Sequence, residues 1–351
     1  MSIKNYDVVV TDLHHRITGV STTIRTLLPL LNKRLKLCLV SKQKEPGIQT
    51  IGLRDVFAQL RSHKTDKKTT IWHVRRNNEM RWALIAKFIF RANIKIVFTS
   101  AAKRRHSAYP RWLISKMDAV IATSDEAASF VQPVIATIQH GVDCNRFRTI
   151  EPDTTLLESL GLTGKHHIGI FGRVRAEKGT DIFVASMLRV LPLFPEYKAV
   201  IVGKTTRKFR VFRNELELQI DKAGLSNRFI WLDEVPYEYM PQIYNAMSLV
   251  TAPARYEGFG MVPLEAMACQ VPVVASRTGA YEDMIEPGVN GALVACGDAE
   301  GLQISVQAFL ESPELLSQRG RAGREIVLSK FSAELEAEAI KSVYQQLWTM
   351  E

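Results

Sequence analysis

The sequence predicts an α/β protein built from two parallel-sheet domains. Short apolar runs of strand length alternate with segments of helix length, and this alternation occurs in both halves of the 351-residue chain. Strands separated by helix-length connections predict parallel βαβ units. A chain of this length also exceeds one typical hydrophobic core, which favours two domains.

The apolar runs define the expected strands. They are residues 8–10, 37–40, 70–74, 94–98 and 119–122 in the first half, and residues 168–171, 199–202, 229–232, 249–251 and 273–275 in the second. We expect a first domain over 1–150, a polar linker over 151–166 that carries proline and glycine, and a second domain over 167–330. Residues 331–351 have apolar side chains at helical spacing and predict a C-terminal helix.

Composition indicates an ordinary soluble protein: hydrophobic residues make up 46% and charged residues 23%. The four cysteines are scattered without C-x-x-C spacing, which favours reduced thiols in the cytoplasm over a disulfide framework or a zinc site. The N-terminus lacks an apolar signal core, and no run reaches 18 uninterrupted apolar residues, so we expect no membrane span.

Charge is unevenly distributed along the chain. Residues 1–150 hold 26 Lys and Arg against 10 Asp and Glu, whereas residues 151–351 hold 20 against 26. The basic half predicts an anionic partner. Nucleic acid, an anionic membrane surface and an acidic lipid-linked acceptor all fit this prediction. We expect no nucleic-acid binding, because no helix-turn-helix, RNA-binding or zinc-finger signature is present.

Residues 255–265 (RYEGFGMVPLE) form the most informative segment. Gly258 and Gly260 permit unusual backbone angles and a close approach to a ligand. Glu257 precedes a predicted helix, and Glu265 lies about two turns further on. A helix N-terminus suits an anion, and two carboxylates suit hydroxyl groups, so a phosphate and a sugar would fit together. The simpler alternative is a helix start whose dipole favours acidic residues.

A second segment, Gly172–Gly179 (GRVRAEKG), follows a predicted strand. Arg173 offers a fork of donors and Lys178 a point charge, so both could reach one pyrophosphate from a strand-to-helix loop. Taken alone, two cations in such a loop are also consistent with a solvated surface. Gly179 would ease entry into the helix expected near Thr180.

Both segments resemble signatures of the retaining family-4 glycosyltransferases: the E-x7-E segment, and the G-R-x(3–5)-E-K-G segment at the expected distance before it. Residues 138–147 are similar to the segment that closes the first domain of this family, with Gly141 at a turn and Phe147 as an anchor. The first-domain segments 15–23, 98–106 and 111–124 look like those of the alphaproteobacterial lipopolysaccharide core mannosyltransferases.

The resemblance implies the GT-B fold, with two facing Rossmann-like domains, a central cleft, and a C-terminal helix that packs back on the first domain. It implies that Arg173 and Lys178 neutralise a leaving diphosphate. Glu257, with the segment Gly258, Phe259 and Gly260, would hold the sugar, and Glu265 the ribose. These residues would bind the donor without a metal ion or other cofactor.

The resemblance also assigns functions to loops of the first domain. Gly19 is expected to let the backbone approach the donor. Many relatives carry a histidine at the end of the fourth strand, where this chain has Thr99 and Ser100, so His106 is the candidate for a catalytic role or an acceptor contact. The basic triple Lys103, Arg104 and Arg105 is the candidate acceptor site.

The implied reaction is transfer of a hexose with retention at the anomeric carbon. The implied donor is GDP-mannose, and the implied acceptor is a Kdo-containing lipid A precursor at the inner face of the inner membrane. A cytoplasmic chain without a span would reach that acceptor as a peripheral protein, through its basic half. Another sugar-nucleotide enzyme on this fold, such as a glucosyltransferase, a galactosyltransferase or an epimerase, is the nearest alternative.

Overall fold

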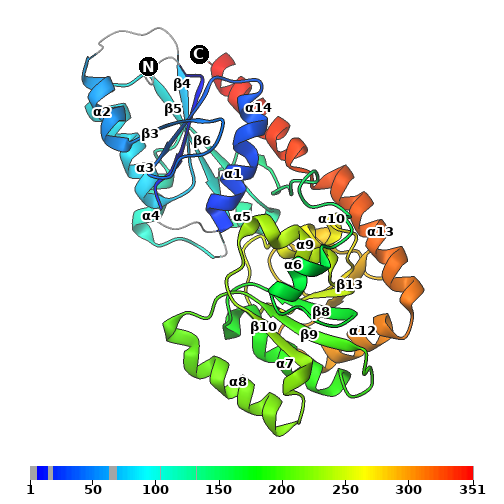
Figure 1. Ribbon diagram of the computed structural model, residues 1–351. Helices are drawn as coiled ribbons and strands as arrows, with labels where there is room; N and C mark the ends of the chain where they lie inside the picture. Colours follow the sequence, from blue (N-terminus) through cyan, green and yellow to red (C-terminus); the bar gives the residue numbers. More distant parts are fainter. Residues whose placement is uncertain (1–5, 15–18, 63–68, 103, 132, 351) are drawn as a thin grey trace. The chain divides into compact units, whose positions relative to one another are not determined.

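The computed structural model describes residues 6–14, 19–62, 69–102, 104–131 and 133–350, and the chain divides into two compact units (Figure 1). Unit 1 comprises residues 1–143 together with 331–351, and unit 2 comprises residues 144–330. The change of unit therefore falls at Cys144, earlier than the expected boundary at 150. The expected linker, 151–166, lies within unit 2 and contains a short helix, α6 (Thr154–Ser159).

Unit 1 is built on a seven-stranded parallel sheet in the order β3-β2-β1-β4-β5-β6-β7. The third strand in this order, β1, pairs with β2 through Val8 and Leu37, and with β4 through Val8 and Ile71. The strands are β1 (Val8–Asp12), β2 (Leu37–Ser41), β3 (Gln49–Ile51), β4 (Thr70–Val74), β5 (Ile94–Ser100), β6 (Ala119–Ala122) and β7 (Ala136–Thr137). Every residue of β1, β2 and β4 is buried, as continuous apolar runs require when helices cover both faces.

Two layers of helices cover this sheet (Figure 1). α1 and α14 pack together on one face, and α2, α3 and α4 cover the other. The helices of unit 1 are α1 (Gly19–Asn32), α2 (Leu53–Ser62), α3 (Asn77–Leu84), the π-helical turn η2 (Ile85–Ile89), α4 (Ala108–Ile114), α5 (Asp125–Phe130) and α14 (Ala333–Thr349).

Unit 2 repeats the scheme with a six-stranded parallel sheet in the order β10-β9-β8-β11-β12-β13. Its strands are β8 (His166–Phe171), β9 (Tyr197–Val202), β10 (Phe229–Leu232), β11 (Leu249–Ala252), β12 (Val273–Ser276) and β13 (Gly291–Val294). Besides α6, its α-helices are α7 (Thr180–Val190), α8 (Arg210–Lys222), α9 (Met240–Asn245), α10 (Val262–Ala268), α11 (Tyr281–Met284), α12 (Ala299–Leu310) and α13 (Pro313–Lys330). Four 3₁₀ turns complete it: η3 (Ala176–Lys178), η4 (Arg207–Phe209), η5 (Ser226–Arg228) and η6 (Tyr237–Tyr239).

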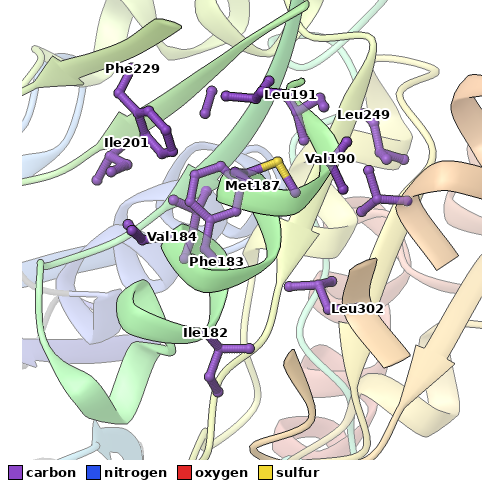
Figure 2. Packing of buried hydrophobic residues seen from close by; sticks show 14 of the residues in the cluster. Ile182, Phe183, Val184, Met187, Val190, Leu191, Ile201, Phe229, Leu249 and Leu302 are labelled. Atoms are coloured by element: carbon purple, nitrogen blue, oxygen red, sulfur yellow. The ribbon is translucent and has the colours of Figure 1, made fainter. Parts of the chain in front are cut away.

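Helix α7 forms the centre of the unit 2 core (Figure 2). Phe183 and Met187 are fully buried, in one apolar cluster with Ile201 of the sheet and Leu302 of α12. Complete burial of such a side chain stabilises the fold by about 1.5–3 kcal/mol. This core fixes the start of α7, and therefore the loop that precedes it.

The C-terminal helix α14 belongs to unit 1 and is joined to it by buried polar contacts. The Tyr344 hydroxyl lies 2.6 Å from Nδ1 of His73, whose Nε2 lies 2.7 Å from Oγ1 of Thr99. Glu336 lies 2.8 Å from Nδ1 of His140 and accepts a 2.7 Å hydrogen bond from the Gly141 amide. The strands β4 and β5 and the segment that follows β7 are thus connected to the last helix of the chain.

All ten expected strands are present, and three further strands were not expected. β3, β7 and β13 are short and lie at sheet edges. β3 is polar and partly exposed, β7 has two residues, and β13 begins with Gly291. Edge strands have one unpaired side and need no continuous apolar run, so the sequence pattern misses them.

Removal of the Tyr344 hydroxyl should destabilise unit 1. In Tyr344→Phe the buried His73 loses a partner, and an unsatisfied buried polar group costs about 1–3 kcal/mol. We expect a lower midpoint in urea, whereas Tyr109→Phe, a matched change at an exposed tyrosine of α4, should leave the midpoint unchanged. Equal midpoints for Tyr344→Phe and wild type would contradict this role for the hydroxyl.

Candidate active site

The two segments selected from the sequence lie side by side at one edge of the unit 2 sheet. β8 and β11 are neighbouring parallel strands, paired through Ile168 and Leu249. Residues 172–179 follow β8, which ends at Phe171, and residues 255–265 follow β11, which ends at Ala252. Since carboxyl ends of adjacent parallel strands lie at the same edge, Lys178 and Glu257 meet there although they are 79 residues apart in sequence.

An ion pair between Lys178 and Glu257 joins the two loops. Their side chains are only 21% and 12% exposed, so water screens the pair weakly. The other Glu257 oxygen, Oε1, accepts a 3.0 Å hydrogen bond from the Gly258 amide. Lys178, which is expected to bind a phosphate, is therefore in direct contact with Glu257, which is expected to bind a sugar hydroxyl.

Arg255 makes a second connection between the loops. Its guanidinium donates two 2.7 Å hydrogen bonds to the two oxygens of Asp181 and a third of 2.7 Å to the Ala176 carbonyl. The Arg255 amide also donates to the Glu177 carbonyl at 3.0 Å. The hydrogen bond with Asp181 raises the pKa of Arg255, so the bidentate pair stays charged. No local pattern in the sequence singles out this pair, because its partners lie 74 residues apart.

Two glycines let these loops approach each other. Gly179 has φ of +74°, and a Cβ there would lie 1.9 Å from the Pro253 carbonyl oxygen. Gly260 has φ of +86°, and a Cβ there would lie 2.3 Å from the ring of Tyr281. Only glycine satisfies both the angle and the space at these two positions. The expectation of unusual backbone angles at Gly260 is therefore confirmed.

The remaining expected donor residues lie around this contact. Arg173 is exposed, and its guanidinium makes no hydrogen bond or ion pair with any described residue. Gly258 is half-buried, and Phe259 is buried beside it. The structure thus brings Lys178, Glu257 and residues 258–260 together, and leaves Arg173 directed to solvent on the same loop.

Glu265 occupies a different environment. It lies in the first turn of α10, which begins at Val262, so the helix starts where the sequence predicts it. The Tyr244 hydroxyl donates a 2.7 Å hydrogen bond to its Oε2. Burial raises the pKa of Glu265, and the bond from Tyr244 opposes that rise. Tyr244 itself stacks on Phe171 at the end of β8, with ring centroids 4.1 Å apart.

Unit 1 holds a charged network at the corresponding edge of its own sheet, which the sequence reading missed. Arg76 donates to Asp12 at 2.7 Å, to Glu79 at 2.9 Å and to Ser21 at 3.1 Å. Asp12 ends β1, and Arg76 follows β4 by two residues. Glu79 is fully buried, and burial raises its pKa. Its carboxylate accepts hydrogen bonds from the backbone amides of Leu13, Arg75 and Arg76. The sequence pattern that could have indicated this network is Asp12 after one apolar run and Arg75-Arg76 directly after another.

The other expected residues of unit 1 are less enclosed. Arg104 and Arg105 are exposed in the loop after β5, and Lys103 lies outside the described residues. His106 is partly buried: its Nε2 has no hydrogen-bond partner among the described residues, and burial lowers its pKa. Gly19 is the first residue of α1, and a Cβ there would meet no atom within 4 Å.

Within the described ranges, no group of three or more His, Cys, Asp or Glu side chains could hold a metal ion. No helix in the same part of the chain combines the length and apolar character that a bilayer span needs.

Comparison with known proteins identifies the class of protein that this site belongs to. Residues 154–326 match the family model described as glycosyl transferases group 1. The chain is 38% identical over 346 residues to the lipopolysaccharide core biosynthesis mannosyltransferase LpcC of Rhizobium leguminosarum bv. viciae, covering 98% of this chain and 97% of the relative. It is 35% identical over 351 residues to the lipopolysaccharide core biosynthesis mannosyltransferase LpsB of Rhizobium meliloti, covering 99% of each.

The chain therefore belongs to the group 1 glycosyl transferases, and it is an enzyme of the glycosyltransferase class. Its fold is also found among solved structures: Anabaena HepE in complex with UDP-glucose superimposes with a TM-score of 0.81 at 20% identity, covering 97% of this chain and 100% of that one. This likeness confirms the expected α/β architecture of two Rossmann-like units.

The raised pKa of Glu265 predicts a pH-dependent stability. Between the unfolded pKa and the higher folded pKa, the folded chain binds more protons than the unfolded chain, so the contribution of Glu265 to stability falls as pH rises. Glu265→Gln removes this titration. We therefore expect the melting temperature of Glu265→Gln relative to wild type to increase from about pH 4 to about pH 7.

Glu300→Gln, at an exposed glutamate of α12, is the matched control and should show no such trend. A constant difference between Glu265→Gln and wild type across the same pH range would show that the burial of Glu265 has no energetic consequence.

Proposed function

We propose that this enzyme transfers mannose from GDP-mannose, with retention at the anomeric carbon, to a Kdo-containing lipid A precursor of the lipopolysaccharide core. The observation that best supports transfer from a sugar nucleotide is the ion pair between Lys178 and Glu257, which joins two loops at strand ends. Similarity over nearly the full chain to two lipopolysaccharide core mannosyltransferases supports the choice of mannose and of the core acceptor.

The proposed chemistry follows from the properties of the two loops. Departure of a nucleoside diphosphate concentrates negative charge on its outer phosphate, and fixed cations stabilise that charge in the transition state. Lys178 is held in place by Glu257, while Arg173 has no competing partner among the described residues. We assign both cations to the diphosphate.

The sugar and the nucleotide are assigned to the two carboxylates. Glu257 and the amides of Phe259 and Gly260 would hold the hexose hydroxyls, because the glycines leave the backbone accessible there. Glu265 would accept from the ribose hydroxyls with one oxygen while Tyr244 donates to the other. Retention by attack from the face of the departing phosphate is the mechanism that the family resemblance implies.

The proposed place of action is the cytoplasmic face of the inner membrane, reached as a peripheral protein. The charge excess of residues 1–150, 26 basic against 10 acidic, supports attraction to anionic lipid and to an acidic acceptor. Transfer is expected to need no metal ion. Glucosyl or galactosyl transfer on the same fold is the alternative for the donor.

A donor panel tests this proposal. The purified protein would be incubated with radiolabelled GDP-mannose, UDP-glucose or UDP-galactose and a Kdo-lipid A acceptor, with and without EDTA. We expect label to enter the lipid fraction from GDP-mannose alone, equally in both conditions. Label only from a UDP-sugar would replace the donor assignment, and transfer abolished by EDTA would contradict metal independence.

The diphosphate assignment predicts large rate losses. Arg173→Ala and Lys178→Ala should each lower kcat by about 10²-fold or more, because each removes charge stabilisation in the transition state. Arg210→Ala, at an exposed arginine of α8, is the control and should keep the wild-type rate. Activity within threefold of wild type in both loop variants would remove this assignment.

Substitution of the two carboxylates should affect different kinetic parameters. Glu257→Gln is expected to reduce kcat more than donor affinity, since its partner is the reacting sugar. Glu265→Gln should weaken donor binding by about 1–2 kcal/mol through loss of a charge-assisted hydrogen bond to ribose. Steady-state kinetics with varied donor separate the two effects. An unchanged kcat in folded Glu257→Gln would argue against contact with the sugar.

A further inference from the structure

One long segment of unit 1 has basic residues and no acidic ones in its sequence, although its Lys87 pairs with Asp118 just beyond it. Residues 80–117 hold nine Lys and Arg and no Asp or Glu. The segment includes most of α3, then η2, β5 and α4. Its exposed basic side chains are Arg81, Arg91, Arg104, Arg105, Arg111 and Lys116.

The same segment exposes large apolar side chains. Their exposed fractions are 39% for Trp82, 63% for Phe88, 71% for Ile89, 51% for Tyr109 and 54% for Trp112. Four of the six exposed large aromatic residues in the described part of the chain lie here. We call these five residues, with Arg81, Arg111 and Lys116, the aromatic-basic face.

The aromatic-basic face is the outer side of a single helical layer. α3 and α4 contact each other and cover one face of the sheet together with α2 (Figure 1). They already bury Met80, Ala83 and Leu113 against the sheet, so their inward side is complete. Outside this layer Trp82 contacts the ring of Phe57 in α2, whereas Phe88, Tyr109 and Trp112 are each more than half exposed.

Local geometry favours this outward display. The amide of Phe90 bonds to the Ile85 carbonyl five residues earlier, at 3.2 Å, which is the π-helical pattern of η2. π-helical turns are rare and are frequent at functional sites. Tyr109 and Trp112 stack on the surface of α4, with ring centroids 6.2 Å apart and planes 18° apart.

We propose that the aromatic-basic face docks the enzyme on an anionic lipid bilayer, with Trp112, Phe88 and Ile89 entering the interface. Trp and Tyr favour the headgroup level of a membrane, and basic residues are attracted to anionic lipid. The strength of such binding scales with buried apolar area plus electrostatic attraction to anionic lipid, and both contributions are present here.

A bilayer fits this face better than a nucleic acid does. Phe88 and Ile89 are the two most exposed of its apolar side chains, and they are adjacent. An isoleucine offers no ring on which a base could stack, whereas it enters lipid readily. This choice of partner also rests on the lipid-linked acceptor of the proposed function. The loop with Arg104 and Arg105 leads directly into α4, so docking would bring these two arginines to the headgroups.

Vesicle co-sedimentation tests the proposal without donor or acceptor. The full chain would be mixed with vesicles of phosphatidylethanolamine and phosphatidylglycerol, or of phosphatidylcholine alone. We expect binding to the anionic vesicles only, and a blue shift of tryptophan fluorescence that Trp112→Phe reduces. Part of the bound protein should remain at about 0.5 M salt, because screening acts on the charges and not on the apolar contacts.

Two triple variants separate the charged and apolar contributions. Arg81→Glu/Arg111→Glu/Lys116→Glu should weaken binding at least tenfold, and Phe88→Ser/Ile89→Ser/Trp112→Ala should abolish the salt-resistant fraction. Arg210→Glu/Lys222→Glu and Val211→Ser/Leu218→Ser, at exposed positions of α8, are the matched controls and should bind as wild type. Thermal unfolding confirms that each variant is folded.

The outcomes distinguish this surface from the proposed reaction. Variants that bind vesicles as wild type does, or binding of single-stranded RNA in place of vesicles, would overturn the docking surface. Both triple variants should still transfer mannose to a delipidated, water-soluble acceptor at the wild-type rate. If wild type transfers mannose to that acceptor but does not bind vesicles, the docking surface is refuted and the proposed function is not. Vesicle binding without any transfer would refute the function alone.

Discussion

The ion pair between Lys178 and Glu257 is the interaction on which the candidate active site depends. It joins loops that follow two adjacent strands, and the Arg255–Asp181 pair joins the same loops a few residues away. Glycine at 179 and 260 permits the close approach that both pairs need. The position of Lys178, the proposed catalytic cation, is therefore set in part by a second loop.

The same principle organises unit 1. Its parallel strands also end at one edge, where Asp12, Arg76 and Glu79 form a partly buried network. The last helix of the chain supplies Tyr344 and Glu336 to buried partners near that edge. Unit 1 therefore reaches its final arrangement only when the two ends of the sequence have come together.

Much of this architecture could be predicted because fully buried parallel strands leave a clear pattern. Runs such as Val8–Val10 and Val273–Ala275 are apolar at every position, since helices cover both faces of each sheet. The segments around Arg173 and Glu257 were also recognisable, because the family motif fixes their residue types and spacing.

The environment of those residues could not be predicted. Tyr244, which bonds Glu265, lies 21 residues away on another helix, and Asp181 is 74 residues from Arg255. The buried His73 on β4, bonded to Thr99 and Tyr344, read as an ordinary strand residue. Partners of this kind are chosen by tertiary packing, which local periodicity does not encode. The aromatic-basic face could not be predicted either, because its residues form one surface only when α3 and α4 pack in the same layer.

We propose that Lys178 and Arg173 bind the outer phosphate of the nucleotide. Calorimetric titration of wild type and Arg173→Ala with GDP and with GMP tests this most directly, because the two ligands differ by that phosphate alone. We expect wild type to bind GDP at least tenfold more tightly than GMP, and this preference to fall to about threefold or less in Arg173→Ala while GMP affinity is unchanged. An equal preference for GDP in both proteins would contradict it.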